Sequence, residues 1–556
     1  MAQKNMVWYY RGMGMDSLGK MGKPEEKQIE RPGKDEVLAR VDALAICASD
    51  IKMINMGREY PLFRNRNFEN FPAILGHELS LTVVEAGKNL EQRWKPGMRI
   101  GIQPDVYMDS IRYCVGVNTD GGMQQYILLK KPTFYSDQGE TIFPVKKELS
   151  YAAVAQLEPN ACVEAAYRRW GREDFKRDGS LLLYIGEEGD ESFVLDKNLC
   201  HARISAFIKG KKTKKYPDNM RVFHSLEQAI KSEKEGFHDI LIMGSTADEE
   251  LELMINHMNQ DGLFCWLVQS ETGQKVHVDI AKVHYGTMNW IGTDTHCLSD
   301  AFRKENRRYE LKKDGKMLIM GGAGAMGRMH TLRALTMKDG PKVIVVTAKG
   351  RKRLNALKED FFKIAQEQGK QLEIVAINEN GWKEKLRSIC GKEGFDDVIV
   401  AAPGVEPVEN AVLFLRKDGM LVLFSGTKYG SYTKLPIGYT ASFHGKIHAS
   451  SGSTVEDQKH ILEKIESGQY QLDKNVMAVA GLNALKDAAE AVASGKFSGK
   501  VIVYPQLLKL PLTDLKEIGA YDTVLAQIAK NGWNQQAERR LYAIEGKEVM
   551  CHEKCK

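Results

Sequence analysis

The chain has 556 residues, 43% of them hydrophobic and 27% charged, which is the composition of a globular protein and excludes a chain that is disordered overall. The net charge of +6 is small for this length, so it gives no indication of nucleic-acid binding and only mildly favours anionic substrates such as phosphates. The length allows about three or four domains of ordinary size.

The sequence predicts neither a membrane span nor a secreted protein. No apolar stretch approaches about 18 residues, and the first residues lack the apolar core of a signal peptide. The nine cysteines are scattered along the chain, as expected for free thiols in a reducing cytoplasm. Residues 551–555 include Cys551, His552 and Cys555 and could ligate a metal, although a frayed terminus is the simpler interpretation.

Residues 1–170 are expected to be mostly β, because short alternating segments such as 37–41 and 81–85 are separated by glycine and proline signals. Three motifs here carry metal-ligand side chains, namely Cys47-Ala-Ser49-Asp50, Gly76-His77-Glu78 and Glu158-Pro159. A thiolate, an imidazole and a carboxylate are the ligand types that a catalytic zinc commonly takes.

Each of these residues alone has a simpler interpretation. A lone Cys47 would more often be a small buried core residue, and a lone His77 a histidine with its hydrogen bonds satisfied. The Gly-His-Glu triplet directly precedes a predicted strand and stands thirty residues after Cys47. This arrangement favours a metal site.

From about residue 170 to 460 the pattern changes to strand, helix, strand, which predicts parallel sheets with crossover helices. This region contains an internal repeat: three pairs of matching segments stay about 158 residues apart. The pairs begin at Gly236 and Gly394, at Asp261 and Asp418, and at His284 and Phe443. We therefore expect two consecutive nucleotide-fold domains.

The two copies differ where a phosphate would bind. The second copy has Gly322, Gly324 and Gly327 between an apolar strand at 317–320 and a helix at 328–335, which is the setting of a dinucleotide fingerprint. The first copy carries four carboxylates in residues 186–191 at an expected helix N-terminus, where they would repel a pyrophosphate and satisfy the helix dipole themselves. The first copy is therefore interpreted as a degenerate, structural domain.

The end of the second strand of the second copy bears on the choice of cofactor. An acidic residue there would bond the ribose 2′-hydroxyl of NAD, but residues 347–353 contain no carboxylate and several cations. These cations favour the 2′-phosphate of NADP over NAD. The alternative is that they are solvated charges at the start of a helix.

The motifs occur in the order found in the zinc-dependent medium-chain alcohol and polyol dehydrogenases, and the closest likeness is to the sorbose-1-phosphate reductase type. The resemblance rests on Cys47, the triplet at 76–78, Lys95-Pro96-Gly97, Asp120-Gly121-Gly122, Glu158-Pro159 and the glycine fingerprint. It covers residues 1–170 and 312–556, and the degenerate copy between them looks inserted.

The resemblance implies a partly open, GroES-like β-barrel as the catalytic domain. With the two tandem Rossmann-like domains that the internal repeat predicts, the expected fold class is α/β. Residues 1–170 would form the first part of the zinc-binding catalytic domain, 171–311 the degenerate domain and 312–460 the NAD(P)-binding domain. Residues 461–556 would return to the catalytic domain and end in the tail.

By position in the family, Cys47, His77 and either Glu78 or Glu158 would hold one catalytic zinc. Ser49 would pass the alcohol proton outward, unless it only caps its own backbone turn. Lys52 replaces a histidine that often serves as the outer proton relay, and it could instead meet a substrate phosphate. No structural zinc is expected, because residues 103–119 contain one cysteine and one thiol cannot build such a site.

The resemblance also implies the cofactor contacts. The residues expected at the phosphates and ribose are Gly322, Gly324, Ala325, Met326, Gly327, Thr347, Lys349, Arg351 and Arg353. Those expected at the nicotinamide half are Ala402, Gly426 and Thr427.

The predicted activity is hydride transfer between NADP(H) or NAD(H) and a polyol or sugar, with or without a phosphate. Arg58, Arg64 and Arg66 lie between the two ligand motifs and either receive such a phosphate or form a basic solvated loop. Two other functions stay open, a zinc-independent alkene reductase of the same superfamily and a non-catalytic nucleotide-binding scaffold. A homo-oligomer, either a dimer or a tetramer, is expected, with no nucleic-acid partner.

Overall fold

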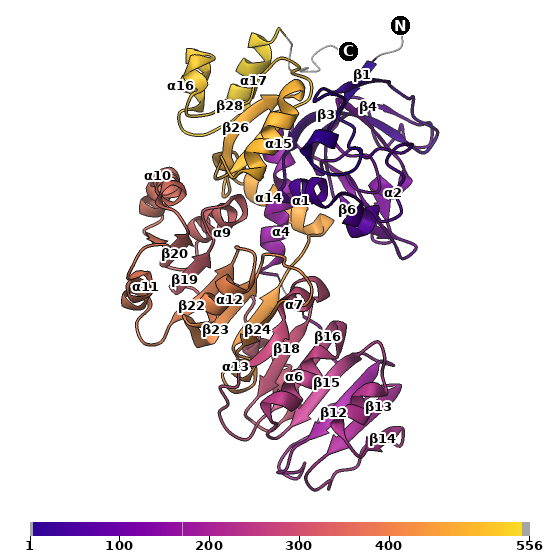
Figure 1. Cartoon of the computed structure of the whole chain (residues 1–556), viewed down its shortest axis with the longest axis vertical. Coiled ribbons are helices and arrows are strands. Elements are labelled where there is room, and N and C mark those ends of the chain that lie inside the picture. Colours follow the sequence, from indigo (N-terminus) through magenta and orange to yellow (C-terminus); the bar gives the residue numbers. More distant parts are fainter. Residues whose placement is uncertain (1–3, 169–170, 547–556) are drawn as a thin grey trace. The chain divides into compact units, whose positions relative to one another are not determined.

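The computed structural model describes residues 4–168 and 171–546, so the cysteine-containing tail lies outside the described residues. The chain forms two compact units. Unit 1 comprises residues 1–162 and 452–556, and unit 2 comprises residues 163–451. None of the described helices is both long and apolar enough to cross a membrane. Unit 2 contains the first predicted nucleotide-fold segment, 171–311, and residues 312–451 of the second, which was predicted to reach residue 460 (Figure 1).

Unit 1 is built on an eight-stranded sheet in the order β11-β5-β4-β3-β27-β26-β28, with β8 also paired to β3. The strands of unit 1 are β1 (Lys4–Val7), β2 (Glu25–Gln28), β3 (Val37–Ala45), β4 (Glu78–Ala86), β5 (Arg99–Ile102), β6 (Asp105–Met108), β7 (Ile111–Cys114), β8 (Tyr126–Leu129), β9 (Tyr135–Ser136), β10 (Gly139–Glu140), β11 (Ile142–Pro144), β26 (Val476–Gly481), β27 (Lys500–Tyr504) and β28 (Thr513–Asp514). Its helices are α1 (Ala48–Met56), α2 (Lys131–Phe134), α3 (Tyr151–Ala155), α14 (Val455–Glu466), α15 (Leu485–Ala493), α16 (Thr523–Ala529) and α17 (Gln535–Ile544). Helix α4 (Leu157–Ala165) begins in unit 1 and ends in unit 2.

The pairing register of three of these strands brings distant residues together. In the antiparallel pair of β3 and β4, Ala45 lies opposite Glu78, and in the pair of β3 and β27, Ala45 lies opposite Ile502. Cys47 lies two residues after the end of β3, His77 directly precedes β4, and Lys500 is the first residue of β27. These residues therefore meet at one edge of the sheet, although they are far apart in the sequence.

Unit 2 contains two six-stranded, all-parallel sheets with equivalent strand orders, β14-β13-β12-β15-β16-β18 and β21-β20-β19-β22-β23-β25. The elements of the first copy are β12 (Ser180–Ile185), β13 (Arg203–Ile208), β14 (Met220–Phe223), α5 (Leu226–Lys231), β15 (Phe237–Met243), α6 (Asp248–Asn256), β16 (Met258–Leu267), β17 (Val276–Asp279), α7 (Ile280–Gly286), β18 (Asn289–Thr293) and α8 (Leu298–Ala301). Those of the second are β19 (Lys316–Met320), α9 (Ala325–Thr336), β20 (Val343–Ala348), α10 (Arg351–Glu367), β21 (Gln371–Ala376), α11 (Trp382–Cys390), β22 (Phe395–Val400), α12 (Val405–Val412), β23 (Leu415–Leu423), β24 (Tyr432–Leu435), α13 (Gly438–Ser442) and β25 (Lys446–Ala449). The predicted tandem Rossmann-like domains are confirmed.

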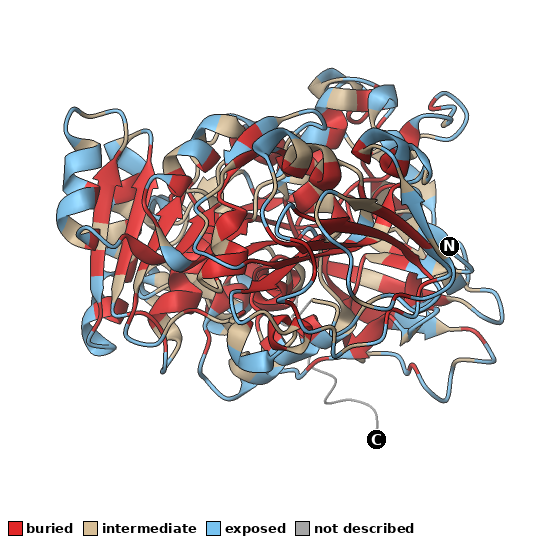
Figure 2. Cartoon of the chain, turned by 90° about the horizontal axis from the view of Figure 1, so that it is seen from below, coloured by how far each residue is buried: buried red, intermediate tan, exposed pale blue. Residues whose placement is uncertain are grey.

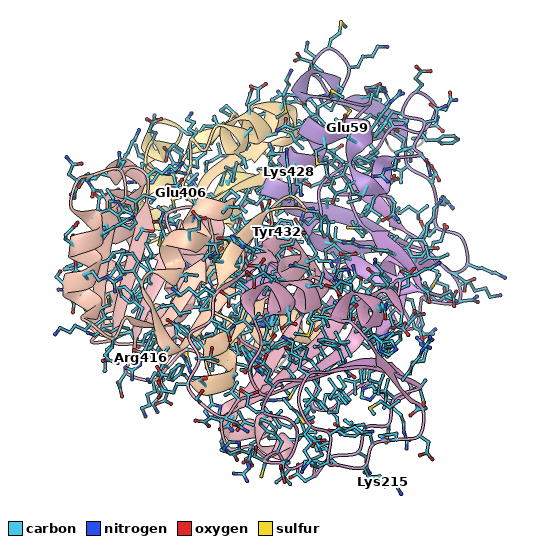
Figure 3. All side chains as sticks on the ribbon, turned by 60° about the horizontal axis from the view of Figure 1, so that its bottom comes forward. Glu59, Lys215, Glu406, Arg416, Lys428 and Tyr432 are labelled. Atoms are coloured by element: carbon cyan, nitrogen blue, oxygen red, sulfur yellow. The ribbon has the colours of Figure 1, made fainter. Side chains whose placement is uncertain are left out.

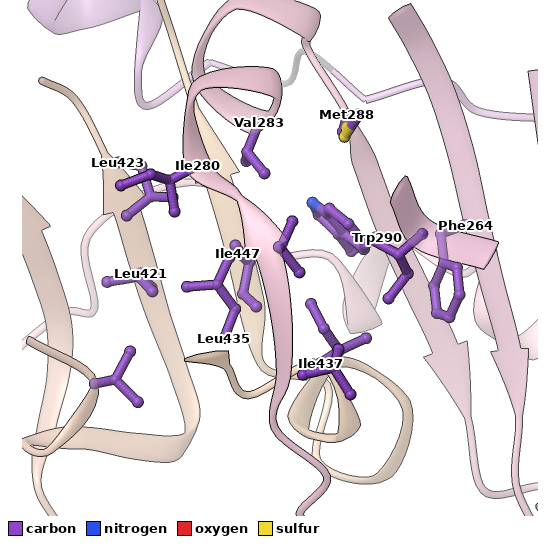
Figure 4. Packing of buried hydrophobic residues seen from close by; sticks show 14 of the residues in the cluster. Phe264, Ile280, Val283, Met288, Trp290, Leu421, Leu423, Leu435, Ile437 and Ile447 are labelled. Carbon is purple, nitrogen blue, oxygen red and sulfur yellow. The ribbon is translucent and has the colours of Figure 1, made fainter. Parts of the chain in front are cut away.

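Most strands of the two parallel sheets are buried, as expected for sheets whose two faces are covered, but the edge strand β14 is not. Figure 2 shows how much of the chain is buried. Within unit 2, one apolar cluster runs through both copies and includes Trp290 of the first and Leu421 and Ile447 of the second (Figure 4). The two copies therefore share a core.

The copies pack against each other in a reciprocal way. The equivalent strands β17 and β24 pair antiparallel with each other, from Val276 opposite Leu435 to Asp279 opposite Tyr432. Helix α7 of the first copy contacts β25 and β23 of the second, while α13 of the second contacts β18 and β16 of the first. The last strands, β18 and β25, also contact each other. This is the self-complementary pattern of a two-fold symmetric interface, formed inside one chain.

The acidic segment of the first copy differs from the prediction. No helix follows β12, and residues 186–202 form an irregular loop, so the argument from a helix dipole is wrong. The buried Asp190 carboxylate accepts hydrogen bonds from the backbone amides of Thr213 and Lys214 and from the Tyr216 hydroxyl, and Glu188 accepts one from the backbone amide of Ser245. These contacts give the loop an alternative to helical hydrogen bonding.

Candidate functional site

Three side chains in unit 1 form a candidate metal site. Ligand atoms of Cys47, His77 and Glu78 all lie within 4.8 Å of one another, and this is the one such group among the described residues. Glu78 is fully buried, and the other two are partly exposed. The donor set, one sulfur, one imidazole nitrogen and one carboxylate oxygen, fits zinc.

Asp50 positions two of these ligands. It stands at the third position of α1, and its Oδ2 accepts a hydrogen bond of 2.9 Å from the backbone amide of Cys47. Its Oδ1 lies 3.2 Å from Nδ1 of His77. Burial by itself would lower the pKa of His77, but the Asp50 carboxylate and the Cys47 side chain together outweigh it and raise the pKa well above its ordinary value. A carboxylate at Nδ1 leaves Nε2 for a metal, the usual arrangement around a metal-binding histidine.

Lys500 neutralises Glu78. Its Nζ lies 2.5 and 2.6 Å from the two carboxylate oxygens, and both side chains are buried. Burial raises the pKa of Glu78, and the Lys500 ammonium only partly offsets this. Burial would lower the pKa of Lys500, but the Glu78 carboxylate raises it overall. Glu78 therefore lies among the candidate ligands while its two oxygens are held by a cation.

Glu158, the alternative carboxylate, lies on α4, close enough to raise the pKa of Glu78 but outside the compact ligand group. Cys162, one turn further along α4, donates a hydrogen bond of 3.2 Å from Sγ to Oε1 of Glu158. Burial raises the pKa of the Cys162 thiol, and the Glu158 carboxylate raises it further. Cys162 is therefore a protonated donor to Glu158.

The other predicted residues of this region differ in whether their side chains are free to contact a substrate. Ser49 lies beside the ligands, with its Oγ 3.3 Å from Nε2 of His77. Lys52, Arg58 and Arg64 are exposed. Arg66, by contrast, donates to the backbone carbonyls of residues 71, 72 and 117, so its guanidinium holds the loop together and is not presented to a substrate phosphate.

The glycine fingerprint of unit 2 surrounds the start of α9. A Cβ on Gly322 would lie 2.4 Å from Cγ1 of Val346, and one on Gly327 would lie 2.3 Å from Cα of Gly322, so both glycines are required by packing within the protein.

The third glycine of the fingerprint has free space around it, since a Cβ on Gly324 would meet nothing closer than 4.0 Å. Gly324 is also the N-cap of α9, with no side-chain cap. The open space and the uncapped amide groups fit a phosphate. Ala325 and Met326, the next two residues, are half-buried.

The residues after β20 are not equally exposed. Thr347 is buried and donates its hydroxyl to the carbonyl of Ile319, so its side chain is not presented to a ribose. Arg351 is exposed and forms an ion pair with Glu379. Lys349 and Arg353 are exposed. These two cations are therefore better placed than Thr347 to meet a 2′-phosphate.

The residues predicted at the nicotinamide half, Ala402, Gly426 and Thr427, follow β22 and β23 and are half-buried. Ala402 packs against the fingerprint turn, because a Cβ on Gly321 would lie 2.5 Å from the Cβ of Ala402. The carboxyl ends of parallel strands at the centre of a sheet are where such folds bind ligands.

Sequence reasoning named no role for two residues of the metal site. Asp50 carried a local signal, because an acidic residue three positions after an N-cap forms a capping box. Lys500 carried none, since its contact with Glu78 spans 422 positions of the sequence.

Comparison with known proteins agrees with the fold. Residues 33–136 match the alcohol dehydrogenase GroES-like domain family. The chain is 28% identical to the uncharacterised protein YggP of Escherichia coli over 44% of this chain and 59% of that protein. It is 26% identical to L-sorbose 1-phosphate reductase of Klebsiella pneumoniae over 42% and 56%. The chain thus spans less than two thirds of the length of these relatives.

Among solved structures, 2R,3R-butanediol dehydrogenase from Bacillus subtilis aligns with a TM-score of 0.51 at 16% identity, covering 90% of this chain and all of that one. This likeness shows the fold. The sequence matches in addition show that parts of the chain are similar to alcohol and polyol dehydrogenases, as the motifs predicted.

Proposed function

We propose that the protein is a zinc-dependent oxidoreductase that transfers a hydride between NADP(H) and a polyol or sugar. The observation that carries this proposal is the compact group of Cys47, His77 and Glu78 in a chain that also has an uncapped, open glycine turn at Gly324. The first is a zinc-type donor set and the second a phosphate-binding turn.

In this proposal Cys47, His77 and either Glu78 or Glu158 hold the zinc. When bound, zinc supplies Lewis acidity that polarises a carbonyl or lowers the pKa of an alcohol, while the nicotinamide supplies the hydride chemistry. Asp50 fixes the orientation of His77, and Ser49, whose hydroxyl lies beside the imidazole, takes the proton of the substrate hydroxyl towards solvent.

A phosphorylated substrate is supported by exposed positive charge on the residues that follow the Cys47 motif. Lys52, Arg58 and Arg64 are exposed on α1 and on the segment that follows it, and none of them is tied to the backbone in the way that Arg66 is. We propose a polyol or ketose phosphate as the substrate class, a cytoplasmic location in which the thiol ligand stays reduced, and a homo-oligomeric assembly.

The function is tested with protein prepared without chelators. We expect about one zinc per chain by elemental analysis, and oxidation of polyols or reduction of ketoses when phosphorylated and unphosphorylated substrates are each tried with both cofactors. Turnover of activated alkenes by metal-free protein would instead identify the alkene reductase, and binding of a dinucleotide without any hydride transfer would identify the scaffold.

The cofactor preference is tested at the end of β20. We expect Lys349→Ala and Arg353→Ala each to raise the KM for NADPH about tenfold or more, because each removes a charge-assisted contact to the 2′-phosphate. The KM for NADH should change little. Arg351→Ala is the matched control, because this guanidinium is already paired with Glu379 and its loss should have a smaller effect. Equal effects on both cofactors would contradict the assignment.

A further inference from the structure

The first copy in unit 2 lacks the phosphate-binding turn, yet it touches the loop of the second copy that is expected to hold the nicotinamide half. A Cβ built on Gly426 would lie 2.4 Å from the hydroxyl oxygen of Tyr285 and 3.2 Å from Nε2 of His284. Both side chains belong to α7 of the first copy. Position 426 must therefore be glycine, because side chains of the other copy leave no room for a Cβ.

Further contacts hold the same loop. His284 donates from Nδ1 to the carbonyl of Leu423 at 3.1 Å, at the very end of β23. The ring of Tyr285 lies 4.6 Å from that of His284 and 5.6 Å from that of Tyr429, measured between centroids. The Tyr285 hydroxyl is therefore the tip of a ring that is packed on two sides, and it has little freedom to move away from Gly426.

The far end of the loop is fixed by the first copy as well. Asp279 accepts a hydrogen bond of 2.9 Å from the backbone amide of Gly430, and the amide of Ile280 donates to the carbonyl of Ser431 at 3.0 Å. The pairing of β17 with β24 continues from this point. Figure 3 shows Lys428 and Tyr432, which flank this end of the loop. Residues 424–431 are thus held at both ends by β17 and α7.

Each copy contacts a loop of the other copy, but only the second copy has a phosphate-binding turn. On the opposite side, Ser442 of α13 accepts a hydrogen bond of 2.7 Å from the amide of Thr272, in the loop after β16 of the first copy. The corresponding phosphate turn of the first copy is occupied by its own Glu188, whose carboxylate lies 2.8 Å from the position of a Cβ on Gly186. The contact of Tyr285 with Gly426 is therefore the one that can affect a bound dinucleotide.

We propose that Tyr285 and His284 are positioning residues for the cofactor: the copy without the fingerprint fixes loop 424–431 in the conformation that receives the nicotinamide half. This inference rests on the proposed dinucleotide binding. It gives the inserted copy a role at the site that does not require it to bind a nucleotide.

The test is a double-mutant cycle at Gly426 and Tyr285, read as the Kd for NADPH by titration calorimetry together with the thermal midpoint and zinc content. Gly426→Ala places a methyl group against the Tyr285 hydroxyl, and we expect the Kd to rise about tenfold. Tyr285→Phe removes that oxygen, so the nearest ring atom to the methyl group becomes Cζ at 3.2 Å. In the double variant we expect the Kd to return to within about threefold of that of Tyr285→Phe alone.

The matched control is Tyr184→Phe, which removes the hydroxyl of a buried tyrosine of the same copy. That hydroxyl donates to Glu250, far along the sequence from the loop. It should leave the Kd for NADPH unchanged. Additive effects of Gly426→Ala and Tyr285→Phe, or an unchanged Kd in Gly426→Ala, would overturn the inference while leaving the proposed function intact. Failure of the wild-type protein to bind either dinucleotide would overturn both.

Discussion

Cys47→Ser is expected to abolish stoichiometric zinc binding and to lower kcat/KM about a thousandfold or more, because a metal that polarises the substrate oxygen contributes several kcal/mol to transition-state stabilisation. Serine keeps the size of the side chain but replaces the soft thiolate with a hydroxyl that stays protonated near neutral pH. Elemental analysis and steady-state kinetics on the same preparation measure the two effects together.

Cys200→Ser is the matched control, because this cysteine is exposed and belongs to unit 2, whereas all the candidate ligands belong to unit 1. It should retain both zinc and activity. If Cys47→Ser keeps about one zinc per chain and wild-type kinetics, the metal assignment is wrong, and with it the proposed function.

Lys500→Met is expected to destabilise unit 1 by about 3–5 kcal/mol in the chelated protein, because it leaves the buried Glu78 carboxylate without its cation. The loss should appear as faster hydrogen–deuterium exchange of the peptides that contain β4 and β27. The double variant Glu78→Gln with Lys500→Met removes the uncompensated charge and should recover most of the stability.

The same variant distinguishes the two candidate glutamates. If Glu78 becomes the third ligand, zinc replaces the missing cation, and the zinc-loaded Lys500→Met protein should regain protection in β4. If Glu158 is the ligand, zinc should leave the loss in β4 unchanged, and Glu158→Gln should weaken zinc binding more than Glu78→Gln does. Full stability of the chelated variant would show that the ion pair is not needed to compensate Glu78.

The parts of the fold that depend on local residue patterns could be predicted from the sequence. Apolar runs beside glycine signals predicted β19 and α9, and the repeat predicted two sheets of the same kind. Cys47 and His77 were found because each carries a ligand side chain in a recognisable motif. Their contact in the folded protein depends on the register of β3 with β4, which places Ala45 opposite Glu78. No sequence motif specifies this register.

The remaining differences arose where long-range contacts decide the role of a side chain. Thr347 has the predicted position but the wrong orientation, because its hydroxyl bonds the neighbouring strand at Ile319. Arg66 is held by carbonyls as distant as Val117. Asp190 accepts hydrogen bonds from a segment more than twenty residues later, which replaced an expected helix with a loop. None of these contacts leaves a periodic signal in the sequence.

The reciprocal packing of the two copies has a consequence for self-association. Two separate subunits that associate through equivalent surfaces dissociate on dilution. Here the two copies belong to one chain, so their association is intramolecular and does not depend on protein concentration. It also occupies the edges formed by β18 and β25, so any further chain that adds to these sheets by strand pairing would have to use the opposite edges, β14 or β21. Linked in this way, the copy without the glycine fingerprint stays packed against the copy that has it at any protein concentration.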